Sequence, residues 1–335
     1  MCKVGVIGAG YWGPNLIRNF QQISRSNVLM VADLNPERLS YIQSLYPTIE
    51  TTTDYKDVIN NEDIDAVAIA APVFTHKDFA LEAMEQDKHV FVEKPMAASV
   101  ADARAMIEVS ERKELCLMVG HTFEYHPAVI KIKEIIDSGE LGEIYYINSQ
   151  RLNLGLFQQD INVVWDLAPH DISMILYWLG KEPKYITAMG TAHINPKIQD
   201  IATVSMVFDD NLIAFVQCSW LDPNKTRKMT IVGSKKMLVY DDIEANNKIW
   251  LFDKGVEKPE HYDTFAEFHY SYRYGDISIP KIANQEPLKM ELTDFIDSIE
   301  NGKQPKTDGK NGLRVVKILE AAQHSIDYGG KSVLI

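Results

Sequence analysis

Three glycines near the start of the chain have the spacing of a turn that binds a dinucleotide. Gly8, Gly10 and Gly13 form Gly-x-Gly-x-x-Gly directly after an apolar run. The first glycine permits the tight bend, the second lets a pyrophosphate approach the backbone, and the third allows close packing of helix on strand. Asp33, 20 residues beyond Gly13, can accept a hydrogen bond from a ribose 2′-hydroxyl and repels a 2′-phosphate. The pattern predicts NAD as cofactor, with NADP less favoured because only the nearby Arg38 offsets the carboxylate.

Two further motifs carry side chains suited to proton transfer. Glu93-Lys94-Pro95 ends an apolar run, which places Lys94 at the carboxyl edge of a sheet, where ligands bind in open α/β folds. Asp166 and His170 are four residues apart and face the same way if the segment between them is helical. Imidazole exchanges protons readily near neutral pH. A solvated lysine, and a capping aspartate with a structural histidine, are the alternatives that these residues alone leave open.

The first 120 residues must bring the glycine turn, Asp33 and Lys94 to one sheet edge. Short apolar runs alternate with longer amphipathic ones, which is typical of βαβ units. The expected strands are Lys3–Ile7, Val28–Asp33, Ala66–Ala71, His89–Val92 and Leu115–Val119, and the expected helices begin at Pro14, Pro36, His76 and Ser99. This rhythm predicts an α/β Rossmann domain with a doubly wound parallel sheet.

After Gly120 the pattern changes. We expect a helix after Pro127, a strand at Glu143–Leu152 and a short helix at Pro169–Trp178. Consecutive strands are then expected at Tyr185–Ala192, Ile201–Phe208, Leu212–Ser219, Lys228–Val232, Met237–Tyr240 and Ile249–Phe252, followed by a loop-like stretch at Lys254–Ile282 and helices at Leu288–Glu300 and Leu313–Tyr328. Strands that follow strands predict an α+β domain with a large, mostly antiparallel open sheet.

We place the domain boundary just after the last expected strand of the parallel sheet. Residues 1–122 form the dinucleotide-binding domain, and residues 123–335 form a domain for substrate binding and oligomerisation. The C-terminal helix of the second domain is free to pack back on the first. The outward face of the second sheet needs a cover, so we expect a homodimer or homotetramer.

Composition limits the partners. The chain of 335 residues carries 34 Lys and Arg against 47 Asp and Glu, so its net charge of −13 disfavours nucleic acids and anionic membranes as partners. The three cysteines are too few and scattered for a disulfide framework or a zinc site, and we expect no metal. With no long apolar run and no signal-like start, the sequence predicts a protein of the cytoplasm.

Together these motifs make the chain resemble the Gfo/Idh/MocA oxidoreductases, which include glucose–fructose oxidoreductase and inositol dehydrogenase. The resemblance rests on Gly8–Gly13, Asp33, Ala71-Pro72 with His76, Glu93-Lys94-Pro95 and Asp166-x-x-x-His170. It implies that Lys94, Asp166 and His170 form the catalytic group beside the nicotinamide. It also implies a cofactor-binding set of Gly8, Gly10, Tyr11, Trp12, Gly13, Asp33, Ala71, Pro72, Thr75, His76, Glu93 and Lys94.

The chain departs from the family pattern around these motifs. Ala168-Pro169 and Ser173 replace a glycine and an aspartate common near the histidine, and Val73 replaces an asparagine common near the nicotinamide. The catalytic positions are retained, so the departures affect the shape of the substrate site. Thr75 and His76 are left as the polar candidates near the nicotinamide.

The expected substrate contacts lie around the catalytic group. His121 and Tyr125 follow the last parallel strand, and Arg151 and Asn153 end a strand shortly before Trp165. Arg151 can hold a phosphate bidentately, although a surface salt bridge is an equal alternative. The substrate set is Lys94, His121, Tyr125, Arg151, Asn153, Trp165, Asp166 and His170.

We expect an NAD-dependent dehydrogenase or reductase that acts on a sugar-type secondary carbinol. The segments Arg151–Gly155 and Trp165–His170 are similar to family members that modify nucleotide-linked sugars, so we expect such a sugar, oxidised at its 3-position, in polysaccharide precursor synthesis. Lys225, Arg227 and Lys228 are further cations for a diphosphate. The alternatives are an inositol or free-sugar dehydrogenase, an NAD-dependent glycosidase and a non-catalytic NAD-binding regulator.

Overall fold

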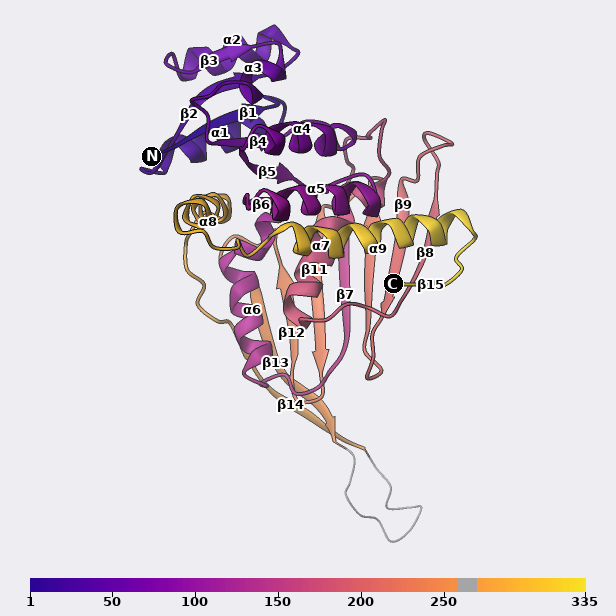
Figure 1. Cartoon of the computed structure of the whole chain (residues 1–335). Helices are drawn as coiled ribbons and strands as arrows, with labels where there is room; N and C mark the ends of the chain where they lie inside the picture. Colours follow the sequence, from indigo (N-terminus) through magenta and orange to yellow (C-terminus); the bar gives the residue numbers. More distant parts are fainter. Residues whose placement is uncertain (258–269) are drawn as a thin grey trace. The chain divides into compact units, whose positions relative to one another are not determined.

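The computed structural model describes residues 1–257 and 270–335, which divide into two units. Unit 1 contains Met1–His126 and Gln285–Glu320, and unit 2 contains Pro127–Asn284 and Ala321–Ile335. Each unit is built around its own sheet (Figure 1). The predicted boundary after residue 122 lies near the first of these divisions and remains a prediction.

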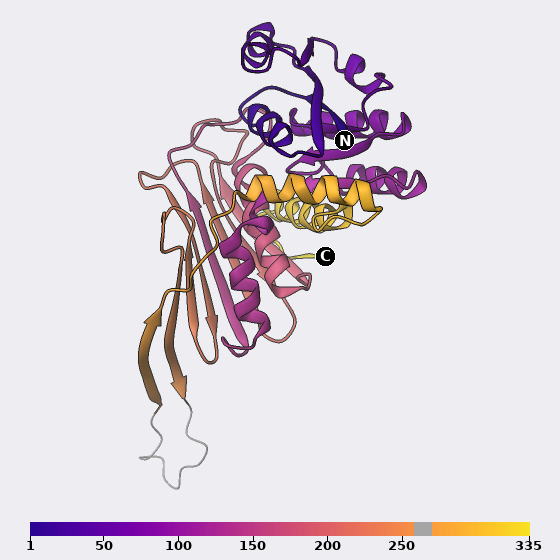
Figure 2. The same cartoon turned by 90° about the vertical axis from the view of Figure 1, so that its left-hand side faces the viewer.

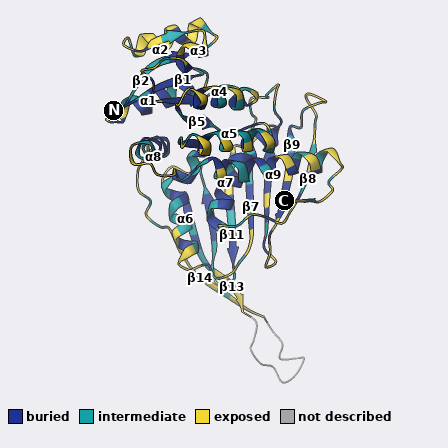
Figure 3. Cartoon of the chain, viewed as in Figure 1, coloured by how far each residue is buried: buried dark blue, intermediate teal, exposed yellow. Residues whose placement is uncertain are grey.

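The sheet of unit 1 has six parallel strands in the order β3-β2-β1-β4-β5-β6. They are β1 (Cys2–Ile7), β2 (Ser26–Ala32), β3 (Glu50–Thr52), β4 (Ala66–Ile69), β5 (His89–Glu93) and β6 (Leu117–Gly120). The order reverses between β1 and β4, which opens the carboxyl edge of the sheet for ligands. All four residues of β4 are buried, and the strands beside it, β1 and β5, are mostly buried as well (Figure 3). This arrangement confirms the predicted doubly wound Rossmann fold.

The helices of unit 1 pack against its strands and, in part, against one another. They are α1 (Gly13–Gln22), α2 (Pro36–Leu45), α3 (Tyr55–Ile59), α4 (Val73–Glu85), α5 (Val100–Arg112), the 3₁₀ turn η1 (Thr122–Tyr125), α8 (Pro287–Asn301) and the first part of α9 (Gly309–Asp327). Helix α1 packs on α8, where the Phe295 ring meets Phe20 and Phe91 edge-on at 6.4 and 5.8 Å. Residues 285–320 thereby complete the core of unit 1.

Two details of unit 1 differ from the sequence prediction. The short strand β3 and the helix α3 were not expected, because three to five residues give too little periodicity to detect. Helix α4 begins at Val73 rather than His76, since Pro72 can occupy the N-cap position. His76 therefore lies in the first turn of α4, with its ring buried.

The sheet of unit 2 has nine strands in the order β14-β13-β12-β11-β7-β10-β9-β8-β15. They are β7 (Ile144–Leu152), β8 (Tyr185–Thr191), β9 (Ile201–Val207), β10 (Ile213–Ser219), β11 (Thr226–Gly233), β12 (Met237–Asp241), β13 (Ile249–Glu257), β14 (Ser271–Ser278) and β15 (Val333–Leu334). Among the described strands of this sheet, only β7 and β10 pair in parallel. Helices α6 (Pro127–Asp137) and α7 (Val163–Leu179) lie against one face of this sheet (Figure 2). The predicted open, mostly antiparallel sheet is confirmed.

Helix α7 is longer than predicted. It was expected over Pro169–Trp178 because proline favours the first turn of a helix, but it begins six residues earlier. The side chain of Asn162 caps it, since Oδ1 accepts from the backbone N–H groups of Val164 and Trp165 at 3.0 and 3.2 Å. Pro169 lies inside the helix, where only the bond to the carbonyl four residues earlier is lost.

The stretch Lys254–Ile282 is not only loop. Strand β13 runs to Glu257, and β14 pairs antiparallel with it at the sheet edge. The part of this stretch from 258 to 269 lies outside the described residues. No helix in residues 1–257 or 270–335 combines the length and apolar character needed to cross a membrane.

Candidate functional site

The glycine turn between β1 and α1 has the geometry that the spacing predicts. Gly8 has φ +101°, and a Cβ there would lie 2.4 Å from the Ala70 carbonyl oxygen. A Cβ on Gly13 would lie 2.2 Å from the Gly8 carbonyl oxygen. Around Gly10 the space is open, since the nearest atom to an added Cβ is Nη1 of Arg38 at 3.7 Å. The turn can therefore close only with glycine at positions 8 and 13, and the space around Gly10 stays accessible to a ligand.

Asp33 holds this turn and faces Arg38. Its Oδ2 accepts a hydrogen bond from the Ala9 N–H at 2.7 Å, and its Oδ1 accepts from the Asn35 N–H at 2.8 Å. Nη1 of Arg38 lies 3.5 Å from the same Oδ2. Helix α1 has no side-chain cap, so its N-terminal N–H groups remain for an anion. A glycine turn with room at Gly10, an uncapped helix and a carboxylate at the end of β2 fit a dinucleotide.

Lys94 directly follows β5, at the carboxyl edge of the sheet, beside the buried carboxyl group of Glu93. Burial raises the pKa of Glu93 to about 7, although the charge and the backbone N–H of Lys94 oppose the rise. Neither Oε1 of Glu93 nor Nε1 of Trp12 has a hydrogen-bond partner among the described residues. Gly120 makes room for this group, since a Cβ there would lie 2.9 Å from Oε2 of Glu93.

His76, predicted to bind cofactor, is buried and bonded to backbone on both sides. Its Nδ1 lies 2.9 Å from the Pro95 carbonyl oxygen, and its Nε2 lies 2.8 Å from the Ala71 carbonyl oxygen. The two ring nitrogens are thus used inside unit 1, and direct bonding of the ring to a cofactor is not supported. Thr75 likewise donates its hydroxyl to the Pro72 carbonyl at 2.7 Å.

His121 and Tyr125 belong to a buried network of unit 1 rather than to an open polar surface. Nδ1 of His121 lies 2.7 Å from Oδ1 of Asn311, and burial lowers the pKa of His121 to about 4. The Tyr125 hydroxyl donates to Asp294 at 2.6 Å. Asn311 of α9 and Asp294 of α8 thus engage Nδ1 of His121 and the Tyr125 hydroxyl, whereas Nε2 of His121 has no hydrogen-bond partner among the described residues, and contact of either side chain with substrate remains a prediction.

The same network holds two further acids, Glu124 and Glu291. Burial raises the pKa of Glu124 to about 7 and raises the pKa of Glu291 as well. Glu291 accepts the Thr122 hydroxyl at 2.7 Å, and Asn311 links Glu124 to His121. Glu291 lies in α8, far from any recognised motif, so no local pattern identified it.

In unit 2, helix α7 carries Asp166 and His170 on one side. The helix is continuous from Val163 to Leu179, so residues four apart face the same way, as predicted. Both side chains are half-buried on a helix whose other residues are mostly buried. The Trp220 indole donates to Oδ2 of Asp166 at 3.0 Å and fixes its carboxylate. Trp220 is 54 residues away in sequence, which explains why its role was missed.

Arg151 is buried, whereas the two predicted alternatives were a phosphate ligand and a surface salt bridge. Its Nε and Nη2 donate to the two carboxylate oxygens of Asp171 at 2.6 and 3.1 Å, and both side chains are buried. Burial lowers the pKa of Arg151, but the attraction of Asp171 outweighs it and the pKa is raised overall. The guanidinium ties β7 to α7, so we do not retain Arg151 as a phosphate ligand.

The remaining predicted contacts are partly engaged. Trp165 is buried in the first turn of α7, and Asn153 is half-buried at the end of β7. Of the other cations proposed for a diphosphate, Arg227 lies 3.6 Å from Asp242 and Lys228 lies 3.7 Å from Asp241. These aspartates offset most of the positive charge expected here.

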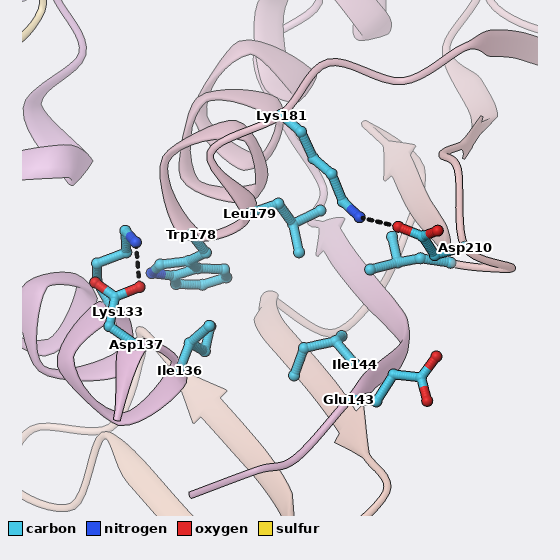
Figure 4. Close-up of a pocket in the computed structure, with 10 residues that line it drawn as sticks. Lys133, Ile136, Asp137, Glu143, Ile144, Trp178, Leu179, Lys181 and Asp210 are labelled. Atoms are coloured by element: carbon cyan, nitrogen blue, oxygen red, sulfur yellow. Dashed lines mark hydrogen bonds and ion pairs between the residues drawn. The ribbon is translucent and has the colours of Figure 1, made fainter. Parts of the chain in front are cut away.

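A hollow of about 440 Å³ lies elsewhere in unit 2 (Figure 4). Ile144 and Trp178 form part of its apolar lining, and two ion pairs, Lys133 with Asp137 and Lys181 with Asp210, stand at its sides. None of the predicted site residues lines it. In the described part of the chain, no group of three or more His, Cys, Asp or Glu side chains is placed to hold a metal ion.

Comparison with known proteins agrees with this geometry. The model of the Gfo/Idh/MocA oxidoreductase family with NAD-binding Rossmann fold matches residues 2–121, and the model of the Gfo/Idh/MocA C-terminal domain matches residues 129–239. UDP-N-acetylglucosamine 3-dehydrogenase of Acidithiobacillus ferrooxidans is 26% identical over 94% of this chain and 94% of that protein. Inositol 2-dehydrogenase of Salmonella typhimurium is 29% identical over 90% and 87%.

A solved structure shares the fold across the full length. Levoglucosan dehydrogenase in complex with NADH and levoglucosan has a TM-score of 0.81 at 21% identity, covering 100% of this chain and 99% of that one. The two family models together match more than half of the residues and agree with the glycine turn and the open sheet. The matched family model makes the protein an oxidoreductase with an NAD-binding Rossmann domain. The chain belongs to the Gfo/Idh/MocA oxidoreductase family.

Proposed function

We propose that this enzyme oxidises or reduces a secondary carbinol of a sugar, with Lys94, Asp166 and His170 as its catalytic residues. The observation that carries the proposal is the placement of Asp166 and His170 on one half-buried side of α7, in a chain where Lys94 directly follows β5. NAD, when bound, accepts or donates the hydride. The chain's own residues supply binding, orientation and proton transfer.

Each catalytic residue has a distinct task. His170 takes the hydroxyl proton during oxidation and returns it during reduction. Lys94 hydrogen-bonds the same oxygen and stabilises the negative charge that develops on it. Asp166, held by the Trp220 indole at 3.0 Å, orients the substrate or the imidazole. A pH profile of kcat in Lys94 and His170 variants identifies which of the two carries the proton.

The test replaces each residue separately. Lys94→Ala and His170→Ala should each lower kcat by about 10²–10⁴, as expected for loss of a positioned acid–base group, with NAD affinity nearly unchanged. Asp166→Asn keeps the geometry and should cost less. Lys131→Ala, on the exposed side of α6, is the control. Wild-type turnover in either alanine variant removes that residue from the catalytic group.

For the substrate we propose a nucleotide-linked sugar, or its 3-keto form, used in making polysaccharide precursors. Similarity to a UDP-N-acetylglucosamine 3-dehydrogenase supports this choice. Lys225 is an exposed cation before β11, whereas Arg151 is committed to Asp171. Steady-state assays with UDP- and dTDP-sugars, inositol and glucose decide the matter, and turnover of a free polyol alone overturns the proposal.

A free-sugar or inositol dehydrogenase is the second candidate. The pairing of Arg227 and Lys228 with aspartates favours it, because a neutral polyol needs no unpaired cations. Inositol 2-dehydrogenase of Salmonella typhimurium is also a relative. An NAD-dependent glycosidase would use the same cofactor without net change, so the absorbance of NADH during turnover separates it from both dehydrogenases.

We further propose a homodimer or homotetramer, in a reducing cytoplasmic compartment. Alternate residues of β9 and β10 point away from the helices, and this outward face exposes Val207 and Phe215 among polar neighbours. A second copy of the sheet would cover them. The three cysteines are all free thiols, which suits a reducing compartment.

A further inference from the structure

The buried imidazole of His76 links two turns at the carboxyl edge of the parallel sheet. One turn, Ala71-Pro72, connects β4 to α4, and the other follows β5 and contains Lys94 and Pro95. The ring lies between them, with Nδ1 at 2.9 Å from the Pro95 carbonyl oxygen and Nε2 at 2.8 Å from the Ala71 carbonyl oxygen. Only 1% of its surface is exposed.

The chemistry of the ring distinguishes this arrangement from a proton-transfer site. Both neighbours are carbonyl oxygens, which accept hydrogen bonds, and a neutral imidazole has one N–H to donate. Burial lowers the pKa of His76, although the carbonyls of Ala71 and Pro95 raise it, and the charge of Lys94 lowers it further. Because both ring nitrogens face backbone carbonyls, the ring is placed to hold the backbone in position rather than to exchange protons with a ligand.

We propose that His76 is a positioning residue, which holds the Lys94 turn in register with the Ala71-Pro72 turn. The proposal rests on the proposed catalytic role of Lys94. The Pro95 carbonyl is one residue from Lys94, so a bond to it restrains the backbone from which the ammonium group extends. The Ala71 carbonyl ties that restraint to β4. A catalytic group displaced by about 1 Å can lose 10²-fold in rate, which is the scale of effect such a restraint can have.

The test compares substitutions that remove different parts of the ring. His76→Phe keeps the ring shape and removes both ring nitrogens, and with them the one hydrogen bond that the neutral imidazole can donate to a carbonyl. His76→Asn offers a donor near the Nδ1 position, and His76→Gln offers one near the Nε2 position. The matched control is His89→Gln. His89 is partly buried, lies at the end of β5 opposite to Lys94, and accepts a hydrogen bond from the Cys116 N–H at 3.0 Å.

Two measurements are made on each variant. The first is kcat and KM with the best substrate. The second is the rate at which acetic anhydride modifies Lys94 in the cofactor-free protein, followed by mass spectrometry, because this reports on the ammonium group without turnover. The melting temperature of each variant shows whether it folds.

The proposal expects His76→Phe to lower kcat by about 10–100-fold with KM for the sugar changed less than about threefold, since binding groups remain in place. The Lys94 modification rate should change by about threefold or more, with His76→Asn and His76→Gln between this variant and wild type. His89→Gln should match the wild type in both. If His76→Phe does not fold, the Asn and Gln variants are judged by the same two measurements.

Two results overturn the proposal. In one, the folded His76 variants keep kcat within twofold of wild type and Lys94 reacts at the wild-type rate. In the other, they lose turnover only through weaker NAD binding, which would make His76 a support for the cofactor turn alone. Failure of the catalytic assignment looks different, because Lys94→Ala would then remain active while the modification rate of Lys94 still depended on His76.

Discussion

Removing either partner of the buried Arg151–Asp171 pair should destabilise unit 2 severely. The pair joins β7 to α7 through bonds of 2.6 and 3.1 Å, with side chains only 4% and 2% exposed. Asp171→Asn keeps the volume of the side chain but leaves the Arg151 charge unpaired in the interior. Arg151→Met keeps the packing of the aliphatic stem and leaves the carboxylate unpaired.

The expected magnitude follows from burial. Stranding one charge of a buried pair costs about 3–5 kcal/mol, because the remaining ion has lost water and its partner. Replacing both residues, as in Arg151→Met with Asp171→Leu, removes the desolvation penalty together with the attraction and should cost about 1 kcal/mol or less. The double variant should therefore be more stable than either single variant. The surface pair Lys236–Glu140 is the control, and Glu140→Gln should cost less than about 1 kcal/mol.

The assay is urea unfolding followed by tryptophan fluorescence, with kcat measured on the same samples. Asp171 directly follows His170, so the single variants should also lose turnover, and the double variant should recover part of it. Additive losses in the double variant would contradict the coupling. Single variants that lose less than about 1 kcal/mol would show that the pair is not desolvated in solution, and the reasoning would fail.

Three further predictions concern cofactor choice, pH and assembly. NAD should bind more tightly than NADP by calorimetry, because Asp33 repels a 2′-phosphate. Equal affinities would indicate that Arg38 offsets this repulsion. The pKa of Glu93 is raised from 4.5 to about 7, so the stability it contributes is present below pH 4.5 and is lost as pH rises through 7. Glu93→Gln should therefore stabilise the protein relative to wild type more at pH 8 than at pH 5, by up to about 3 kcal/mol, and equal effects in thermal unfolding would contradict this. Light scattering should show a dimer or tetramer, whereas a monomer of 38.0 kDa at micromolar concentration would refute the covered sheet face.

The fold was predictable where the signal is local. Except for β3, β14 and β15, the strands of both sheets were expected close to their observed positions, because apolar runs bounded by glycine, proline and aspartate are short-range features. The start of α7 was missed, since Pro169 gave a stronger helix-start signal than the cap at Asn162. Strand β14 was missed because its eight residues are mostly exposed and lack a buried alternation.

The site was predictable where the requirement falls on the backbone or on a compact motif. Gly8 and Gly13 are needed because a Cβ at either would collide with a carbonyl oxygen. The spacing of the glycines in the sequence reflects this requirement. The partners of buried polar groups could not be predicted in this way, because they are distant in sequence. Arg151 meets Asp171 after 20 residues and His121 meets Asn311 after 190, so neither contact was predicted from a nearby motif.

Helix α7 offers a physical criterion for separating such cases. Most of its residues are buried, so each polar side chain on it must find a partner inside the protein or face a surface. Asp171 and Ser173 are fully buried, and they are satisfied by Arg151 and by the His170 carbonyl. Asp166 and His170 are half-buried and lie one turn apart on the same side. Because neither side chain is fully buried, this side of α7 can face a ligand, and we propose that function as well as folding accounts for these two residue types.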